Sequence, residues 1–126
     1  MTNESLEAAY RKRRSILGDA YVDRQRAASG SGSTDFQDYV TSVAWTVWNR
    51  DGLSDRDRSL LVLAMTAALG RMEEFKLHAS CTEQTKVTDV EIDELIFQVT
   101  AYCGAPAGTS ANRAWRQVRA EREVGS

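Results

Sequence analysis

Several residue types that mark particular protein classes are scarce in this chain of 126 residues. There is one proline, and together with many Ala, Leu, Glu and Arg residues this favours helices. One histidine and two cysteines cannot form a standard structural zinc site, so no metal is expected. The cysteines, Cys81 and Cys103, form no CxxC motif, and we expect two buried, reduced thiols.

Long apolar runs and excess positive charge are also missing. The longest apolar run, residues 60–69, is interrupted by Thr66 and is shorter than the roughly 18 residues that a membrane span needs. The net charge of −2 gives no basic field for nucleic acid. The first residues lack the apolar segment of a secretory signal. These absences predict a cytoplasmic protein that binds neither membranes nor nucleic acid.

Helical periodicity is present along most of the chain. Residues 35–49 carry an apolar stripe, and Thr88 with Glu91 forms a capping box before a second stripe in residues 92–102. Residues 58–69 are apolar on nearly every side, which predicts a central helix covered by other helices or by another subunit. We expect one all-α domain over residues 1–126, a compact bundle of five to six helices.

Two segments have other expected roles. Residues 25–34, RQRAASGSGS, are the one low-complexity stretch and predict a flexible connection. Residues 71–85 are expected to continue helically after Gly70, and they carry the most reactive group of side chains.

Arg71, Glu74 and His78 are separated by three and four residues, a spacing that places all three on one helix face. A guanidinium, a carboxylate and an imidazole would then form one polar row, directly after the most apolar segment. His78 is the default residue for proton transfer because its ordinary pKa lies near neutrality. The alternative is a solvated helix face on which Arg71 and Glu74 form an ion pair.

Other candidates carry weaker signals. Trp45 and Trp48 could line an apolar pocket, although helical tryptophans are more often core residues. Cys103 precedes Gly104 at a predicted helix C-terminus, where the helix dipole disfavours a thiolate, so a nucleophilic role is not expected.

The chain resembles γ-carboxymuconolactone decarboxylases over about residues 7–122. The matching pieces are RRSILGDAYVDR at 13–24, FQDYVTSVAW at 36–45, GLSDRDRSLLVLAM at 52–65, ALGRMEEFKLH at 68–78 and VTDVEIDELIFQVTAYCGAP at 87–106. The resemblance implies the helical fold that this family shares with alkylhydroperoxidase D-like proteins. Those proteins carry a redox CxxC motif where Arg71 and Glu74 stand here, so the resemblance argues against a thiol peroxidase.

What the resemblance implies is decarboxylation of 4-carboxymuconolactone or a similar unsaturated lactone acid, as in aromatic compound catabolism through the β-ketoadipate pathway. The carboxylate leaves, a dienolate forms, and protonation gives an enol-lactone without any cofactor, because the ring itself accepts the electrons. The resemblance implies that His78 donates the proton and that Glu74 orients the His78 side chain. Arg71, the third catalytic residue, would bind a carboxylate or the oxyanion. Substrate-binding residues would be Trp45, Trp48, Arg58, Tyr21 and Thr109.

Some positions depart from the family pattern. Histidine is common in the family where Tyr21 stands, asparagine near Thr109, and Phe-His where Asn112 and Arg113 stand. A relative that isomerises, cyclises or hydrates another small lactone or ketone is therefore an alternative, and a binding protein is a more distant one. The resemblance also implies a homo-oligomer, a trimer or a hexamer.

Overall fold

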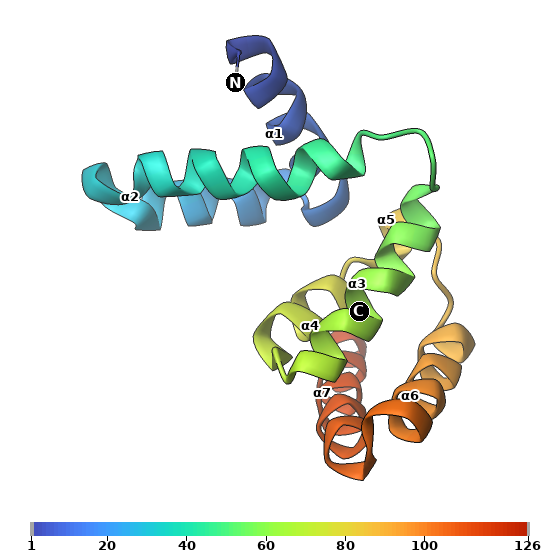
Figure 1. Cartoon of the computed structure of the whole chain (residues 1–126). Helices are drawn as coiled ribbons and strands as arrows, with labels where there is room; N and C mark the ends of the chain where they lie inside the picture. Colours follow the sequence, from blue (N-terminus) through green and yellow to red (C-terminus); the bar gives the residue numbers. More distant parts are fainter. Residues whose placement is uncertain (1, 126) are drawn as a thin grey trace. The chain divides into compact units, whose positions relative to one another are not determined.

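Helices occupy most of the chain, and no strand occurs in the part that the structure describes. The computed structural model describes residues 2–125, without the side chains of residues 29–33. Within that range the helices are α1 (Asn3–Leu17), α2 (Asp19–Trp48), α3 (Asp55–Leu69), α4 (Met72–Ala79), α5 (Thr82–Thr85), α6 (Asp89–Cys103) and α7 (Ala105–Val124) (Figure 1). The all-α class is confirmed. The described residues contain seven helices where five to six were predicted, and one of the seven is the single turn of α5.

Contacts between the helices divide the chain into two compact units, Met1–Ser54 and Asp55–Ser126. The first unit contains α1 and α2, and the second contains α3 to α7. A single domain over residues 1–126 stays a prediction. None of the helices within residues 2–125 combines the length and the apolar character that crossing a membrane requires.

The first unit begins with a well-capped helix. The Thr2 side chain accepts a hydrogen bond from the backbone N–H of Ser5, and the Ser5 side chain bonds back to Thr2, which completes a capping box. Such a cap stabilises a helix by about 1 kcal/mol. The helix ends at Gly18, whose φ of 92° lies in a region that favours glycine. Gly18 therefore separates α1 from α2, which begins at Asp19.

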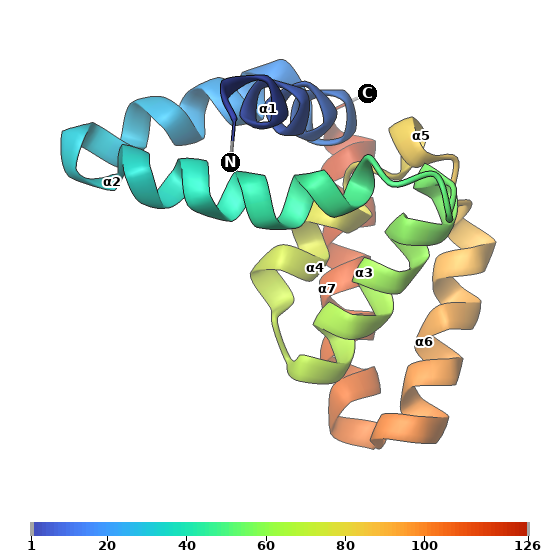
Figure 2. The same ribbon diagram turned by 45° about the horizontal axis from the view of Figure 1, so that its top comes forward.

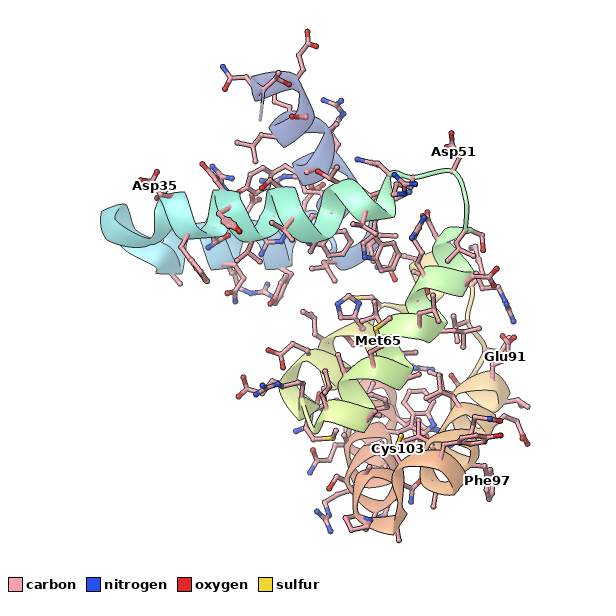
Figure 3. The ribbon with its side chains drawn as sticks, in the orientation of Figure 1. Asp35, Asp51, Met65, Glu91, Phe97 and Cys103 are labelled. Carbon is pink, nitrogen blue, oxygen red and sulfur yellow. The ribbon has the colours of Figure 1, made fainter. Side chains whose placement is uncertain are left out.

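Helix α2 folds back on itself. The Nε2 atom of Gln37 donates a hydrogen bond of 2.8 Å to the backbone carbonyl of Gln25. Twelve residues of straight α-helix would span roughly 18 Å, so the chain must reverse between these two residues. Figure 1 shows the reversal, and Figure 3 places Asp35 close to it. The backbone of residues 25–34 is thus helical around a reversal, and its flexibility stays a prediction.

The returning limb of α2 buries the side opposite to its apolar stripe. Trp45 and Trp48 are buried, together with Thr41. The stripe residues Phe36 and Val43, in contrast, are 70% and 57% exposed. The periodicity predicts the helix correctly, but the face that carries the stripe is left in contact with solvent.

The second unit is built around one apolar core. Its largest fully buried side chains are Trp115, Phe75, Leu63 and Ile92, contributed by α7, α4, α3 and α6 in that order. Burying a side chain of this size contributes about 1.5–3 kcal/mol relative to leaving it exposed. The core therefore fixes which side of each of these helices faces inward.

Two sequence signals define α6. The predicted capping box is confirmed, because Thr88 Oγ1 accepts from the Glu91 N–H and Glu91 Oε1 accepts from the Thr88 N–H. Helix α6 ends at Gly104, with φ of 97°, and α7 starts directly after it with a proline in its first turn. The two helices run antiparallel from that point (Figure 2).

Two predictions need correction. Residues 71–85 do not form one helix, because α4 ends at Ala79 and α5 begins at Thr82. Cys103, expected to be buried, is exposed where α6 ends (Figure 3), whereas Cys81 is buried as expected. Leu61 and Met65 of α3 are exposed in the single chain, so the alternative that another subunit covers this helix stays a prediction.

The contact between α6 and α7 predicts an unusual response at Gly108. A Cβ atom added there would overlap Oγ1 of Thr100 and lie 2.8 Å from its Cβ atom. Gly108→Ala should therefore lower the free energy of unfolding by about 1–3 kcal/mol, as overpacking does, although Ala is the better helix former. Urea denaturation measures this, with Gly52→Ala as the control because nothing lies within 4 Å of that position. A more stable Gly108→Ala variant would contradict the close contact.

Candidate functional site

Helix α4 carries the two residues with the clearest chemistry. The chain turns at Gly70, with φ of 73°, and α4 then packs against α3 and α7. Phe75 and Ala79 are fully buried in the core of the second unit. Because these two side chains fix the rotation of the helix, Glu74 and His78, each one position earlier, lie together beside the buried face.

Glu74 and His78 stand four residues apart on α4, so their Cβ atoms are about 6 Å from each other. Glu74 is exposed in the first turn, and His78 is half-buried in the last turn. A carboxylate reachable from solvent therefore stands next to an imidazole that is partly withdrawn from it. The spacing predicted that the two residues share one helix face, but not this difference in their exposure.

The environment of His78 changes its acidity. Burial lowers the pKa of His78 to about 4, because removing water destabilises the imidazolium ion. The negative charge of Glu74 acts in the opposite direction and raises the pKa of His78. His78 is consequently neutral at neutral pH in the free protein, and any negative charge placed beside it favours its protonation.

The two candidate arginines hold different positions. Arg71 is exposed and precedes the first residue of α4, with φ of −89° and ψ of 73°, so it is not part of the helical row predicted with Glu74 and His78. Arg58 lies in the first turns of α3, and its Nε atom is buried. Neighbouring Ser59 is buried and accepts a hydrogen bond of 3.0 Å from Thr85 Oγ1, which joins the start of α3 to α5.

Thr109 belongs to a separate depression. It lines a groove of about 500 Å³ between α6 and α7, whose lining is Asp93, Ile96, Phe97, Thr100, Gly108, Thr109, Asn112 and Arg116. All of these residues come from α6 and α7, and none comes from α4. Thr109 and Asn112 therefore line the same groove, and a contact between Thr109 and the substrate stays a prediction.

The remaining predicted site residues belong to the first unit. Trp45 and Trp48 are stacked, with ring centroids 5.1 Å apart and an interplanar angle of 27°. Both are buried, and Tyr21 is half-buried in the first limb of α2. A role for these three side chains in substrate binding stays a prediction.

A polar cluster in the first unit has no counterpart among the predicted sites. The Tyr10 hydroxyl donates a 2.6 Å hydrogen bond to Asp38, and the guanidinium of Arg26 lies 4.4 Å from the Tyr10 ring centroid. Burial, with the hydrogen bond to Asp38, raises the pKa of Tyr10. No local pattern could have revealed this cluster, because it depends on the pairing of α1 with both limbs of α2.

Neither thiol is engaged in a disulfide. Cys81 and Cys103 are both free, and burial raises the pKa of the Cys81 thiol. A raised pKa disfavours the thiolate that acts as a nucleophile. Within residues 2–125, no three side chains of the metal-binding types come together to form a cation site.

Comparisons with known proteins agree on one family. A model of the carboxymuconolactone decarboxylase family matches residues 34–117. The chain is 36% identical over 100 residues to 4-carboxymuconolactone decarboxylase of Acinetobacter baylyi, covering 79% of this chain and 75% of that protein. It is 33% identical over 96 residues to nitrosuccinic acid decarboxylase of Metarhizium robertsii, covering 75% and 67%. No solved structure matches the chain significantly.

The matched region includes the returning limb of α2 and every helix from α3 to α6, so it contains both Glu74 and His78. Two separate relatives with decarboxylase activity are similar to the chain over three quarters of its length or more. The chain therefore belongs to the carboxymuconolactone decarboxylase family and is a carboxy-lyase.

Proposed function

We propose that the protein decarboxylates 4-carboxymuconolactone or a similar small unsaturated lactone acid, with His78 as the proton donor. The observation that supports this most is the pairing of His78 with Glu74 on α4, beside a buried face and within the family match. A carboxylate one turn away supports the protonated imidazole that such a reaction needs.

The proposed chemistry begins with loss of carbon dioxide. The bond between the γ-carbon and its carboxylate breaks, and the electron pair moves through the ring double bond onto the lactone carbonyl. The resulting dienolate takes one proton at its α-carbon and becomes an enol-lactone. One proton is consumed for each carbon dioxide released, so the protein must take a proton from solvent in every cycle.

His78 suits this step for a physical reason. An imidazolium whose pKa is lowered by burial is a stronger acid than an ordinary one, so it gives its proton to carbon more readily. The proton reaches His78 when the anionic substrate binds, because a negative charge nearby raises the pKa of His78 as Glu74 does. Glu74 acts as the positioning residue in this scheme.

The arginines supply the other requirement, a site for negative charge. Arg71 and Arg58 can each bind a carboxylate or the developing enolate oxygen through two parallel N–H donors. A single preorganised donor at such an oxygen is typically worth about 3 kcal/mol in the transition state. Substrate contacts by Trp45, Trp48, Tyr21 and Thr109 belong to the same proposal.

A second candidate substrate is a nitro-substituted succinic acid, since one relative is a nitrosuccinic acid decarboxylase. Nitrosuccinic acid and carboxymuconolactone share a carboxylate on a carbon from which electrons can flow into an acceptor, a nitro group or an unsaturated lactone. The proposed proton transfer from His78 is the same for both. Release of carbon dioxide from each purified acid distinguishes them.

The setting of the enzyme is also part of the proposal. The resemblance favours a cytoplasmic homo-oligomer, a trimer or a hexamer, that acts in aromatic compound catabolism.

Substitution of the α4 pair tests the proposed roles. We expect His78→Ala to lower kcat by about 10²–10⁴-fold, because it removes the proton donor. Glu74→Gln should also lower the rate, but by less than His78→Ala does. Glu73→Gln is the matched control, because Glu73 is also exposed in the first turn of α4. Carbon dioxide release from 4-carboxymuconolactone and nitrosuccinic acid is the measurement. Near-wild-type turnover in His78→Ala, or equal rates for the two glutamate variants, would end this assignment.

The pH dependence of kcat/KM gives an independent test. Because the pKa of His78 is about 4 in the free protein, its protonated fraction falls tenfold for each pH unit above that value. If the transition state contains this added proton, kcat/KM should fall about tenfold per pH unit between about pH 5.5 and about pH 8. A flat profile would show that no added proton is needed.

Direct titration complements the kinetics. The chain contains one histidine, so a single imidazole resonance reports the pKa of His78 in NMR spectra. We expect a value near 4, and a lower one in Glu74→Gln, because the Glu74 charge raises the pKa of His78. An ordinary histidine pKa near 6.5 would contradict the burial of this side chain.

A further inference from the structure

Buried polar side chains are few in the part of the chain that the structure describes, and most of them lie close to the helix that carries His78. Ser59, Thr82 and Thr85 are buried and belong to the second unit. A buried hydroxyl costs free energy unless it is hydrogen-bonded, and satisfied buried polar groups hold the segments that carry them in one arrangement. These three hydroxyls connect α5 to α4 on one side and to α3 on the other.

The first connection joins α5 to the end of α4. Thr82 Oγ1 donates a hydrogen bond of 3.1 Å to the backbone carbonyl of Ala79, the last residue of α4. The backbone N–H of Cys81 donates a bond of 3.1 Å to the carbonyl of His78. The segment that leaves α4 is therefore bonded to the carbonyls of the last two residues of that helix, and one of these two residues is His78.

The second connection joins α5 to the start of α3. Thr85 Oγ1 donates the 3.0 Å hydrogen bond to Ser59 Oγ, and Ser59 directly follows Arg58 in the chain. Figure 1 shows α5 beside the start of α3, where these two hydroxyls meet. Both side chains are almost completely buried, at 2% and 1% exposure, so water competes little for this bond.

Local signals in α5 are too weak to fix its position. The helix has four residues, and among the described side chains none caps its start with a hydrogen bond. It ends at Lys86, whose φ of 69° is unfavourable for any residue other than glycine. A single helical turn of this kind is marginal in water. Tertiary contacts, among them the bond between Thr85 and Ser59, therefore decide where α5 lies.

We propose that Thr85 and Ser59 are a positioning pair, which holds Arg58 at the start of α3 and His78 at the end of α4 in a fixed relative position. The bond joins α3 to α5, and α5 is bonded to the end of α4, so a displacement of α5 reaches both side chains. Because Thr85 and Ser59 are buried, they act through these two residues and not by binding substrate. This role rests on the proposed function, in which Arg58 binds the acid and His78 donates the proton.

Removing one hydroxyl while keeping the shape of the side chain tests the pair. In Thr85→Val the donor is lost, and we expect kcat/KM to fall about tenfold, because small displacements of catalytic groups slow the chemical step strongly. The pKa of His78 should rise from about 4 toward its ordinary value, because water reaches the imidazole when the end of α4 loosens. Thr85→Ser keeps the donor and should restore both quantities. NMR titration of the imidazole and carbon dioxide release are the two measurements.

Two further variants separate positioning from a general loss of stability. Val99→Ala truncates a buried side chain of α6, which packs against α3 and α7, so it weakens the core without removing either hydroxyl. It should leave the pKa of His78 unchanged. Ser59→Ala removes the acceptor, and the double variant with Thr85→Val should shift the pKa of His78 no further than either single variant, because the two residues act as one unit.

The outcomes distinguish this pair from the assignment of the proton donor. A folded Thr85→Val variant with an unchanged His78 pKa and an unchanged kcat/KM overturns the pair. So does a Val99→Ala variant whose His78 pKa rises as much, because any loss of stability would then suffice. If Thr85→Val does not fold, as judged by circular dichroism, Ser59→Ala provides the same comparison. The titration needs no turnover, so an active His78→Ala variant contradicts the proton donor while the pKa of His78 still decides on the pair.

Discussion

The burial of Phe75 and Ala79 in the core of the second unit is the constraint on which the candidate site depends. These side chains belong to the same core cluster as Leu63 and Trp115, and their burial sets the rotation of α4. With the rotation fixed, Glu74 and His78 both stand at the edge of the buried face. The chemistry of the site therefore follows from hydrophobic packing that involves no reactive group.

Local patterns in the sequence predicted most of the helices. The capping box of Thr88 and Glu91, the break at Gly18 and the proline after Gly104 each act within a few residues, so they can be identified without tertiary contacts. Arg71 shows the limit of such reasoning. Its spacing from Glu74 suits one helix, but the turn at Gly70 leaves Arg71 just outside α4.

The sequence identified apolar helix faces correctly, but it did not show which of these faces other helices cover. The stripe on α2 was visible in the sequence, but nothing local revealed that the opposite side, with Trp45 and Trp48, would be the buried one. The cluster of Tyr10, Arg26 and Asp38 required the reversal of α2, which no residue pattern specified beyond a low-complexity segment. Thr109 was placed in the site by resemblance, and only tertiary packing could show that it lines a groove between α6 and α7.

The low pKa of His78 connects this packing to the proposed reaction. Withdrawing the imidazole from water makes its protonated form rare in the free protein, which by itself slows a reaction that needs that form. The same withdrawal makes the imidazolium a stronger acid once it forms, and makes it more responsive to a neighbouring charge, because less water screens the interaction. Glu74 and an anionic substrate act in the same direction on this group. In the proposed reaction, His78 therefore becomes an acid chiefly when a negatively charged substrate is present, and proton delivery is restricted to the occupied site.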